Sequence, residues 1–181
     1  MVIWITGLSG AGKTSLARAL ARRFKPQIPE MVIIDGDDVR RLFGPSLGYR
    51  EQDRYTQIRR IQAIARMLDG QGMVVVVAAL YAHPDLLAWN RENFSSYFEV
   101  YLDAPLELVG ERDSKGLYAR AARGETANVV GFDIPWRAPE NPDLRVGVGR
   151  GWEPDEIVVE IAKRVPKLSA LLDAGASEAT G

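Results

Sequence analysis

The stretch Gly7-Leu8-Ser9-Gly10-Ala11-Gly12-Lys13-Thr14 decides the fold of this chain. It matches the phosphate-loop pattern, in which a glycine is followed by four variable residues and then by Gly-Lys-Thr. The short β-branched run Val2–Thr6 precedes it, and residues 14–24 after it carry apolar side chains at helical spacing. A strand, a glycine-rich turn and a helix in this order predict backbone N–H groups that surround a phosphate at a helix N-terminus.

The loop also predicts roles for its own residues. Lys13 brings a positive charge to the β- and γ-phosphates and is a predicted catalytic residue, and the Thr14 hydroxyl is a predicted ligand of Mg²⁺. The motif indicates a bound nucleoside triphosphate but not what is done with it. We expect ATP to be bound by Gly7, Leu8, Ser9, Gly10, Ala11, Gly12, Lys13, Thr14 and Ser15.

Apolar runs alternate with segments of helical period along the rest of the chain. Residues 31–34, 73–79, 98–102 and 144–148 have the length of strands, while 53–68 and 153–172 have helical periodicity, the latter interrupted at Pro166. Strands separated by helices favour parallel βαβ units. The predicted fold is therefore α/β, a three-layer P-loop NTPase fold with a central parallel sheet of about five strands.

The sequence predicts one P-loop domain over residues 1–173. The Gly-, Arg- and Pro-rich stretch 114–142 is long and lacks periodicity, which is typical of a functional loop. We expect a lid over about residues 112–130. Residues 174–181 are small and polar, and we expect them to form a disordered tail.

Composition excludes several classes of function. The 23 Lys and Arg against 24 Asp and Glu give a net charge of −1, which argues against nucleic-acid binding and against polybasic membrane contact. There is no cysteine, and His83 is the single histidine, so thiolate and multi-histidine metal sites are excluded.

No apolar run is long enough for a membrane span, and the N-terminus lacks a basic signal region. We expect a cytoplasmic protein whose partner is a small nucleotide, and the sequence leaves a homodimer open.

Two groups of polar residues follow the phosphate loop. Asp35 and Asp37 come directly after the second predicted strand, at the edge where the ends of parallel strands gather. One carboxylate there can hold a Mg²⁺-bound water, and one can accept a proton from an attacking hydroxyl. Arg40 and Arg54 belong to a local concentration of arginines that suits phosphate or sulfate oxygens, and Tyr49 between them offers a flat stacking surface.

These residues, taken together, resemble the adenylylsulfate (APS) kinase family. The likeness covers roughly residues 1–165 and is much more specific than the phosphate loop alone. Beyond that loop it rests on Asp35-Gly36-Asp37-Asp38-Val39-Arg40, on Leu47-Gly48-Tyr49, on Asp53-Arg54 with Ile58-Arg59-Arg60, on Arg112-Asp113-Ser114-Lys115-Gly116-Leu117-Tyr118, on Gly131-Phe132-Asp133-Ile134-Pro135 and on Pro139-Glu140-Asn141-Pro142.

The resemblance implies a kinase that transfers the γ-phosphoryl of ATP, with Mg²⁺, to the 3′-hydroxyl of adenosine 5′-phosphosulfate. It implies that Asp37 orients or deprotonates this hydroxyl, that Asp35 lies beside the metal, and that Arg112 is a catalytic lid arginine. It further implies an acceptor site made of Asp35, Asp37, Arg40, Tyr49, Arg54, Gln57, Lys115, Gly116 and Leu117, with Thr14 and Asp35 at the metal.

The sequence also departs from the family pattern. Gln57 stands where the family usually has Asn, and Ala82 stands where some members carry a serine that can be phosphorylated. Val129-Val130 replaces a Phe-Thr pair whose Phe closes one side of an adenine sandwich in the family. These departures leave a second acceptor open, a related nucleotide such as a cytidine diphosphoramidate.

His83 follows the third predicted strand. We favour a structural or hydrogen-bonding role for His83 over a role as general base, since it has less motif support than Asp37.

A nucleotide-binding regulatory protein is the alternative to a kinase. The sequence has no Asn-Lys-x-Asp base motif of the kind that GTP-dependent switches carry, and it retains Lys13, Asp35 and Lys115.

Overall fold

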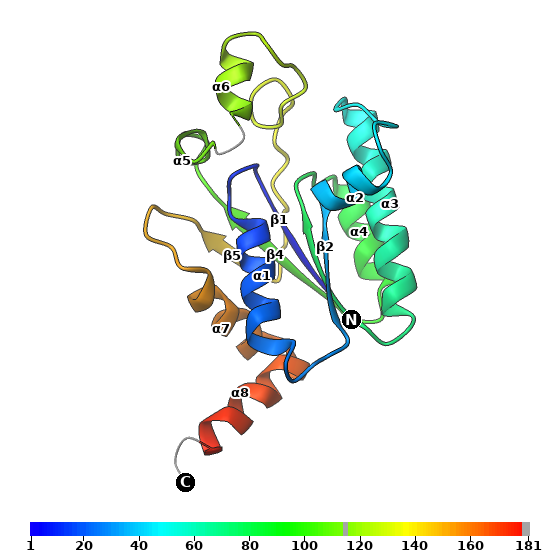
Figure 1. Ribbon diagram of the computed structural model, residues 1–181, viewed down its shortest axis with the longest axis vertical. Helices are drawn as coiled ribbons and strands as arrows, with labels where there is room; N and C mark the ends of the chain where they lie inside the picture. The colour runs from blue at the N-terminus through cyan, green and yellow to red at the C-terminus, as the bar shows by residue number, and fades with distance from the viewer. Residues whose placement is uncertain (114–115, 179–181) are drawn as a thin grey trace.

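The computed structural model describes residues 1–113 and 116–178. Its centre is one sheet of five parallel strands in the spatial order β2-β3-β1-β4-β5, which confirms the predicted sheet (Figure 1). The strands are β1 (Val2–Gly7), β2 (Met31–Asp35), β3 (Val74–Ala79), β4 (Tyr97–Asp103) and β5 (Leu144–Gly147).

The two central strands of the sheet form the middle of the core. Every residue of β1 and of β3 is buried, and the two strands pair in register from Val2 opposite Val75 to Thr6 opposite Ala79. Strands that are apolar on both faces are expected where helices cover a parallel sheet from both sides. This burial holds the end of β1, from which the phosphate loop emerges, in a fixed position.

Helices cover the sheet on both sides (Figure 1). On one side α1 (Lys13–Phe24) packs against α7 (Pro154–Arg164), and on the other α3 (Glu51–Asp69) packs against α4 (Pro84–Asn93). The predicted interruption at Pro166 is confirmed, since α7 ends before it and α8 (Pro166–Glu178) begins with it. A proline is tolerated in the first turn of a helix but not in its interior.

Short helices at the carboxyl edge of the sheet were not predicted. They are α2 (Gly36–Leu42), α5 (Leu106–Glu111) and α6 (Leu117–Ala122), and α5 and α6 lie above the strand ends in Figure 1. The stretch predicted to be irregular, 114–142, therefore contains a helix, whereas its described remainder holds only an isolated bridge between Val130 and Ile134.

The C-terminal part of the chain forms α8, which continues through Glu178. The disordered tail expected from residue 174 stays a prediction. Residues 179–181 lie outside the described part of the chain. Over the described ranges, no helix has both the length and the apolar character that a membrane crossing requires.

A substitution of Leu102 tests how much the core beneath the phosphate loop contributes to stability. The Leu102 side chain is fully buried on β4, and its backbone lies opposite Gly7. We expect Leu102→Ala to lower the free energy of unfolding by about 2–5 kcal/mol, because it removes buried methyl groups and leaves a cavity. Urea unfolding measures the change. Val159→Ala on the outer side of α7 is the control and should cost about 0.5 kcal/mol or less; equal losses would contradict this account of the core.

Candidate active site

The phosphate loop joins β1 to α1 and depends on its glycines. Gly10 and Gly12 have positive φ values of 81° and 98°, which residues with a side chain rarely adopt. A Cβ on Gly12 would also collide with the indole of Trp152, so the two residues are in direct contact. The ammonium group of Lys13 donates hydrogen bonds to the carbonyl oxygens of Gly7 (2.9 Å) and Leu8 (2.7 Å), which fixes it over the loop.

A hydrogen bond connects this loop to the end of β2. The Thr14 hydroxyl donates to the Asp35 carboxylate at 2.6 Å, and the other oxygen of that carboxylate accepts from the backbone N–H of Asp37 at 2.9 Å. Asp35 thereby caps α2 and places Asp37, which is exposed, in the first turn of that helix. Thr14 and Asp35 bring two hard oxygen donors together, which is the donor chemistry that Mg²⁺ prefers beside phosphates.

Two arginines surround the ring of Tyr49. The guanidinium carbon of Arg40 lies 4.5 Å from the ring centroid and that of Arg54 lies 5.6 Å from it. Arg40 donates to the carbonyl oxygens of Leu47 and Gly48, and Arg54 donates to those of Tyr49 (2.9 Å) and Asn128 (2.6 Å). The two side chains therefore hold the 47–49 loop in place, and Arg54 also ties α3 to the loop that follows α6.

The charges of these arginines act on each other. Burial lowers the pKa of Arg54, and the nearby positive charge of Arg40 lowers it further. The two guanidinium groups lie against one ring in a partly buried place, where their repulsion is poorly screened. A bound anion relieves this repulsion, and a guanidinium pair is well suited to phosphate or sulfate oxygens.

Gln57 lies between the two halves of the site. It is 5 % exposed, and its amide nitrogen donates to the carbonyl oxygen of Gly36 at 3.2 Å. Its amide oxygen is buried and has no hydrogen-bond partner in the described structure. An unsatisfied buried acceptor costs about 1–3 kcal/mol, so a donor from a ligand or a water molecule would be stabilising here.

The predicted lid residues are arranged around α6. Gly116 precedes α6 with a φ of 61°, and Leu117 is its first residue. The carboxylate of Asp113 accepts from the N–H groups of Leu117 and Ala119 and so caps the helix, a role that was not predicted. The Tyr118 hydroxyl donates to the carbonyl oxygen of Ser9 at 3.4 Å, so α6 touches the phosphate loop. Lys115, a predicted acceptor ligand, lies outside the described residues.

Arg112 faces a segment that the sequence analysis did not single out. Its guanidinium donates to the carbonyl oxygen of Gly149 at 2.8 Å, on the loop after β5. The same loop carries Trp152, whose indole covers Gly12. The structure therefore places Arg112 against this loop, and its predicted position beside the transferred phosphate stays a prediction. The glycine-rich turn directly before Trp152 is the sequence signal that could have indicated a role for this segment.

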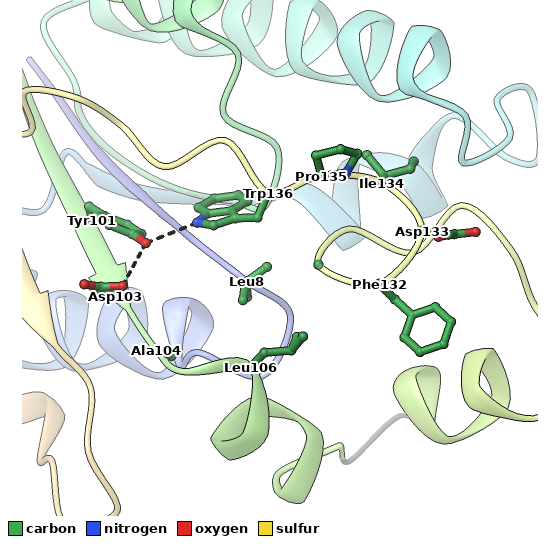
Figure 2. Close-up of a pocket in the computed structure, with 11 residues that line it drawn as sticks. Leu8, Tyr101, Asp103, Ala104, Leu106, Phe132, Asp133, Ile134, Pro135 and Trp136 are labelled. Atoms are coloured by element: carbon green, nitrogen blue, oxygen red, sulfur yellow. Dashed lines mark hydrogen bonds between the residues drawn. The ribbon is translucent and has the colours of Figure 1, made fainter.

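A cavity of about 390 Å³ borders the site between the end of β4 and residues 131–136 (Figure 2). Leu8 of the phosphate loop and Leu106 form its apolar side. On its polar side Trp136 donates to the Tyr101 hydroxyl, which donates to Asp103 at 2.9 Å. Hydrogen bonds from Arg145 lower the pKa of Asp103, so this carboxylate is charged and anchors residues 131–136 to the sheet through Tyr101 and Trp136.

The valines that depart from the family pattern do not face an open site. Val129 and Val130 are 1 % and 2 % exposed and belong to the core. The effect of these two valines on the choice of acceptor stays a prediction. Phe132 is 56 % exposed and lines the cavity, so it is the aromatic side chain that this turn presents (Figure 2).

His83 has a structural role, as favoured from the sequence. Its Nδ1 accepts a hydrogen bond from the N–H of Asp85 at 3.3 Å, which caps α4. Its ring also makes an edge contact with Tyr55 at a centroid distance of 5.7 Å. Ala82 beside it is buried.

Comparison with known proteins supplies the family. The model of the adenylylsulphate kinase family matches residues 1–147, which contain the phosphate loop, the Arg40–Tyr49–Arg54 cluster and the residues around α6. The chain belongs to the adenylylsulfate kinase family.

Individual relatives agree with this membership. The chain is 37% identical over 171 residues to an adenylyl-sulfate kinase of Picosynechococcus, covering 94% of each chain. It is 41% identical over 149 residues to that of Deinococcus deserti, covering 82% of each. Among solved structures it resembles the Mycobacterium tuberculosis APS kinase in complex with AMPPNP and APS, with a TM-score of 0.80, 35% identity, and coverage of 88% of this chain and 94% of that one.

A substitution of Val129 tests whether this buried position belongs to the core or opens into the active site. We expect Val129→Phe to lower the free energy of unfolding by about 1–3 kcal/mol, because a larger ring overfills a packed core. Phe132→Ala, three residues away but exposed, should change it by less than about 1 kcal/mol. Thermal or urea unfolding of both variants decides this; a Val129→Phe protein as stable as the wild type would show that position 129 opens into the site.

Proposed function

We propose that this protein transfers the γ-phosphoryl group of ATP to the ribose 3′-hydroxyl of adenosine 5′-phosphosulfate. Membership of the adenylylsulfate kinase family supports the proposal. The single observation that carries it is the pairing of a complete phosphate loop with the Arg40–Tyr49–Arg54 cluster. The loop suits a triphosphate donor, and two cations around an aromatic ring suit an acceptor that has both an anionic end and a flat base.

The donor end of the proposed reaction uses the phosphate loop. Its backbone N–H groups and the N-terminus of α1 bind the phosphates of ATP, and Lys13 contributes a positive charge. Thr14 and Asp35, already joined by a hydrogen bond, fit Mg²⁺ as oxygen ligands beside the triphosphate. The ion supplies neutralisation of phosphate charge when it is bound.

The acceptor end uses residues from α2, α3 and the loop between them. Arg40 and Arg54 bind the phosphosulfate group, and the ring of Tyr49 lies against the base. The unpaired amide oxygen of Gln57 accepts a hydrogen bond from the acceptor. Gly116, Leu117 and Lys115 complete this side of the site in the proposal, with residues 112–130 acting as a lid.

The chemical step is an in-line displacement at the γ-phosphorus. The 3′-oxygen of the acceptor forms a bond to phosphorus while the bond from phosphorus to the β–γ bridging oxygen breaks, and ADP leaves. The proton of the hydroxyl passes to the carboxylate of Asp37. Asp37 is suited to this role because Asp35 fixes its backbone at the start of α2, next to the phosphate loop.

The direct test is transfer of labelled γ-phosphate from ATP to APS. We expect the wild-type protein to form 3′-phosphorylated product, with a lower kcat/KM for a cytidine diphosphoramidate acceptor. Lys13→Ala should abolish transfer while the protein remains folded, because the charge over the phosphates is lost. ATP hydrolysis that is independent of any acceptor, without phosphorylated product, would instead support a nucleotide-binding regulatory protein.

Asp37 and its neighbour Asp38 form a matched pair for testing the proton acceptor. We expect Asp37→Asn to lower kcat by about 10²–10⁴-fold with little change in the KM for ATP, because the amide cannot take the proton. Asp38→Asn removes the same charge one residue away, from a side chain that pairs with Arg41 on the surface, and should retain activity. Similar losses in the two variants would assign the effect to local charge rather than to proton transfer.

The proposal also includes a cellular location and an assembly. A cytoplasmic location is part of the proposal, and the cysteine-free sequence is compatible with it. A homodimer is the assembly to test first, by measuring the molar mass in solution.

A further inference from the structure

A second cavity, of about 720 Å³, lies on the outer face of α3 and α4. It is formed by α3 from Arg59 onward, by the turn after α3 and by Trp89 of α4, whereas Arg54 and Gln57 of the candidate active site belong to the preceding part of α3. At 1.5 Å per residue, Arg54 and Arg66 are about 18 Å apart along the helix axis. The cavity is lined by Arg59, Gln62, Ala63, Arg66, Met67, Gly70, Gln71 and Trp89.

Trp89 forms the centre of this surface and is held from several sides. Its ring makes an edge contact with the buried Phe94 at a centroid distance of 5.7 Å. The guanidinium carbons of Arg59 and Arg66 lie 4.6 Å and 5.8 Å from the ring centroid. The indole N–H makes no hydrogen bond within the described ranges of the chain. The half-buried ring therefore keeps a donor available beside two cations.

Arg59 is fixed by a buried hydrogen-bond network. It donates to the amide oxygen of Gln62 at 2.9 Å, and the fully buried Gln62 donates to Leu86 and Asn90 at 2.8 Å and 2.7 Å. A guanidinium held in this way loses less conformational entropy when it binds a carboxylate than a free surface arginine does. The arrangement is thus preorganised for a ligand.

The charge of this surface is unbalanced. Among residues 1–113 and 116–178, neither Arg59 nor Arg66 has a carboxylate partner; their hydrogen-bond acceptors are the side-chain amide oxygens of Gln62 and Asn93. The part of α3 from Arg54 to Leu68 carries four arginines and no acidic residue, and no acidic residue lines the cavity. Charge complementarity therefore selects an acidic ligand.

We propose that the Arg59–Trp89–Arg66 groove is a docking site for an acidic peptide segment of a partner protein. Arg59 and Arg66 are seven residues apart, which places them about 10 Å apart along one face of α3. Acidic residues at positions i and i+3 of a polyproline II segment, which has three residues per turn, lie on one face with about the same separation. Trp89 and the exposed Met67 then cover the apolar part of the segment between the two ion pairs.

Fluorescence anisotropy with a labelled peptide tests the proposal. The probe is a capped Gly/Ser peptide with Glu at positions i and i+3 and Leu between them, and its control has Gln in place of both Glu residues. We expect saturable binding of the Glu peptide that weakens as salt rises, and no binding of the Gln peptide. We expect the Arg59→Gln, Arg66→Gln double variant to bind about tenfold more weakly, since two charge-assisted hydrogen bonds are removed.

A matched double variant controls for overall charge. Arg18→Gln with Arg23→Gln removes two arginines from the exposed surface of α1, and Arg23 likewise lies over an aromatic ring, that of Phe24. It should bind the Glu peptide like the wild type. Circular dichroism melts check that every variant is folded. Equal weakening in the two double variants, equal binding of the Glu and Gln peptides, or no saturable binding at millimolar peptide would each overturn the proposal.

Discussion

The hydrogen bond from the Thr14 hydroxyl to the Asp35 carboxylate connects the two parts of the molecule on which the site depends. β1 and β2 are not neighbours in the sheet, because β3 lies between them. The bond nevertheless joins the first turn of α1 to the cap of α2, since both helices begin at the same edge of a parallel sheet. It places the proposed metal ligands together and orients the turn that carries Asp37.

The buried centre of the sheet makes this connection rigid. β1 and β3 are buried along their whole length, so the strand ends that carry the phosphate loop and the segment after Ala79 cannot shift independently. Loops attached to a rigid edge of this kind can differ in sequence without disturbing the phosphate loop. The turn around Val129 is an example, because its valines pack into the core while Phe132 points outward.

The acceptor side is organised by polar side chains that contact backbone carbonyls. Arg40 and Arg54 each use backbone oxygens to shape the 47–49 loop and still leave two like charges close together. An anion bound between the two guanidinium groups would reduce their repulsion and would stabilise the loop through its binding free energy. The same helix, α3, carries the Arg59–Trp89–Arg66 groove about two turns further on, so one element serves both the proposed chemistry and the proposed docking.

The amino-acid sequence by itself determined the phosphate loop, the five strands, helices α1 and α3, and the helical segment interrupted at Pro166, because hydrophobic periodicity and glycine placement are local properties. It also indicated Asp35, Arg40, Tyr49 and Arg54 as site residues, and the structure brings Thr14 to Asp35 and the two arginines to Tyr49. Helices α2, α5 and α6 were missed, since segments of six or seven residues carry too few turns to show a period, and the ten-residue α4 was missed as well.

Only the tertiary structure decided which side chains are buried and which meet across the fold. In the folded protein Val129 and Val130 are buried in the core and Phe132 is exposed, although all three are apolar and nearly adjacent. The tertiary structure brings Trp152 against Gly12 and Arg112 against Gly149, contacts between residues that are distant in the chain. Such contacts depend on how helices and loops cover the sheet, and no local pattern encodes them.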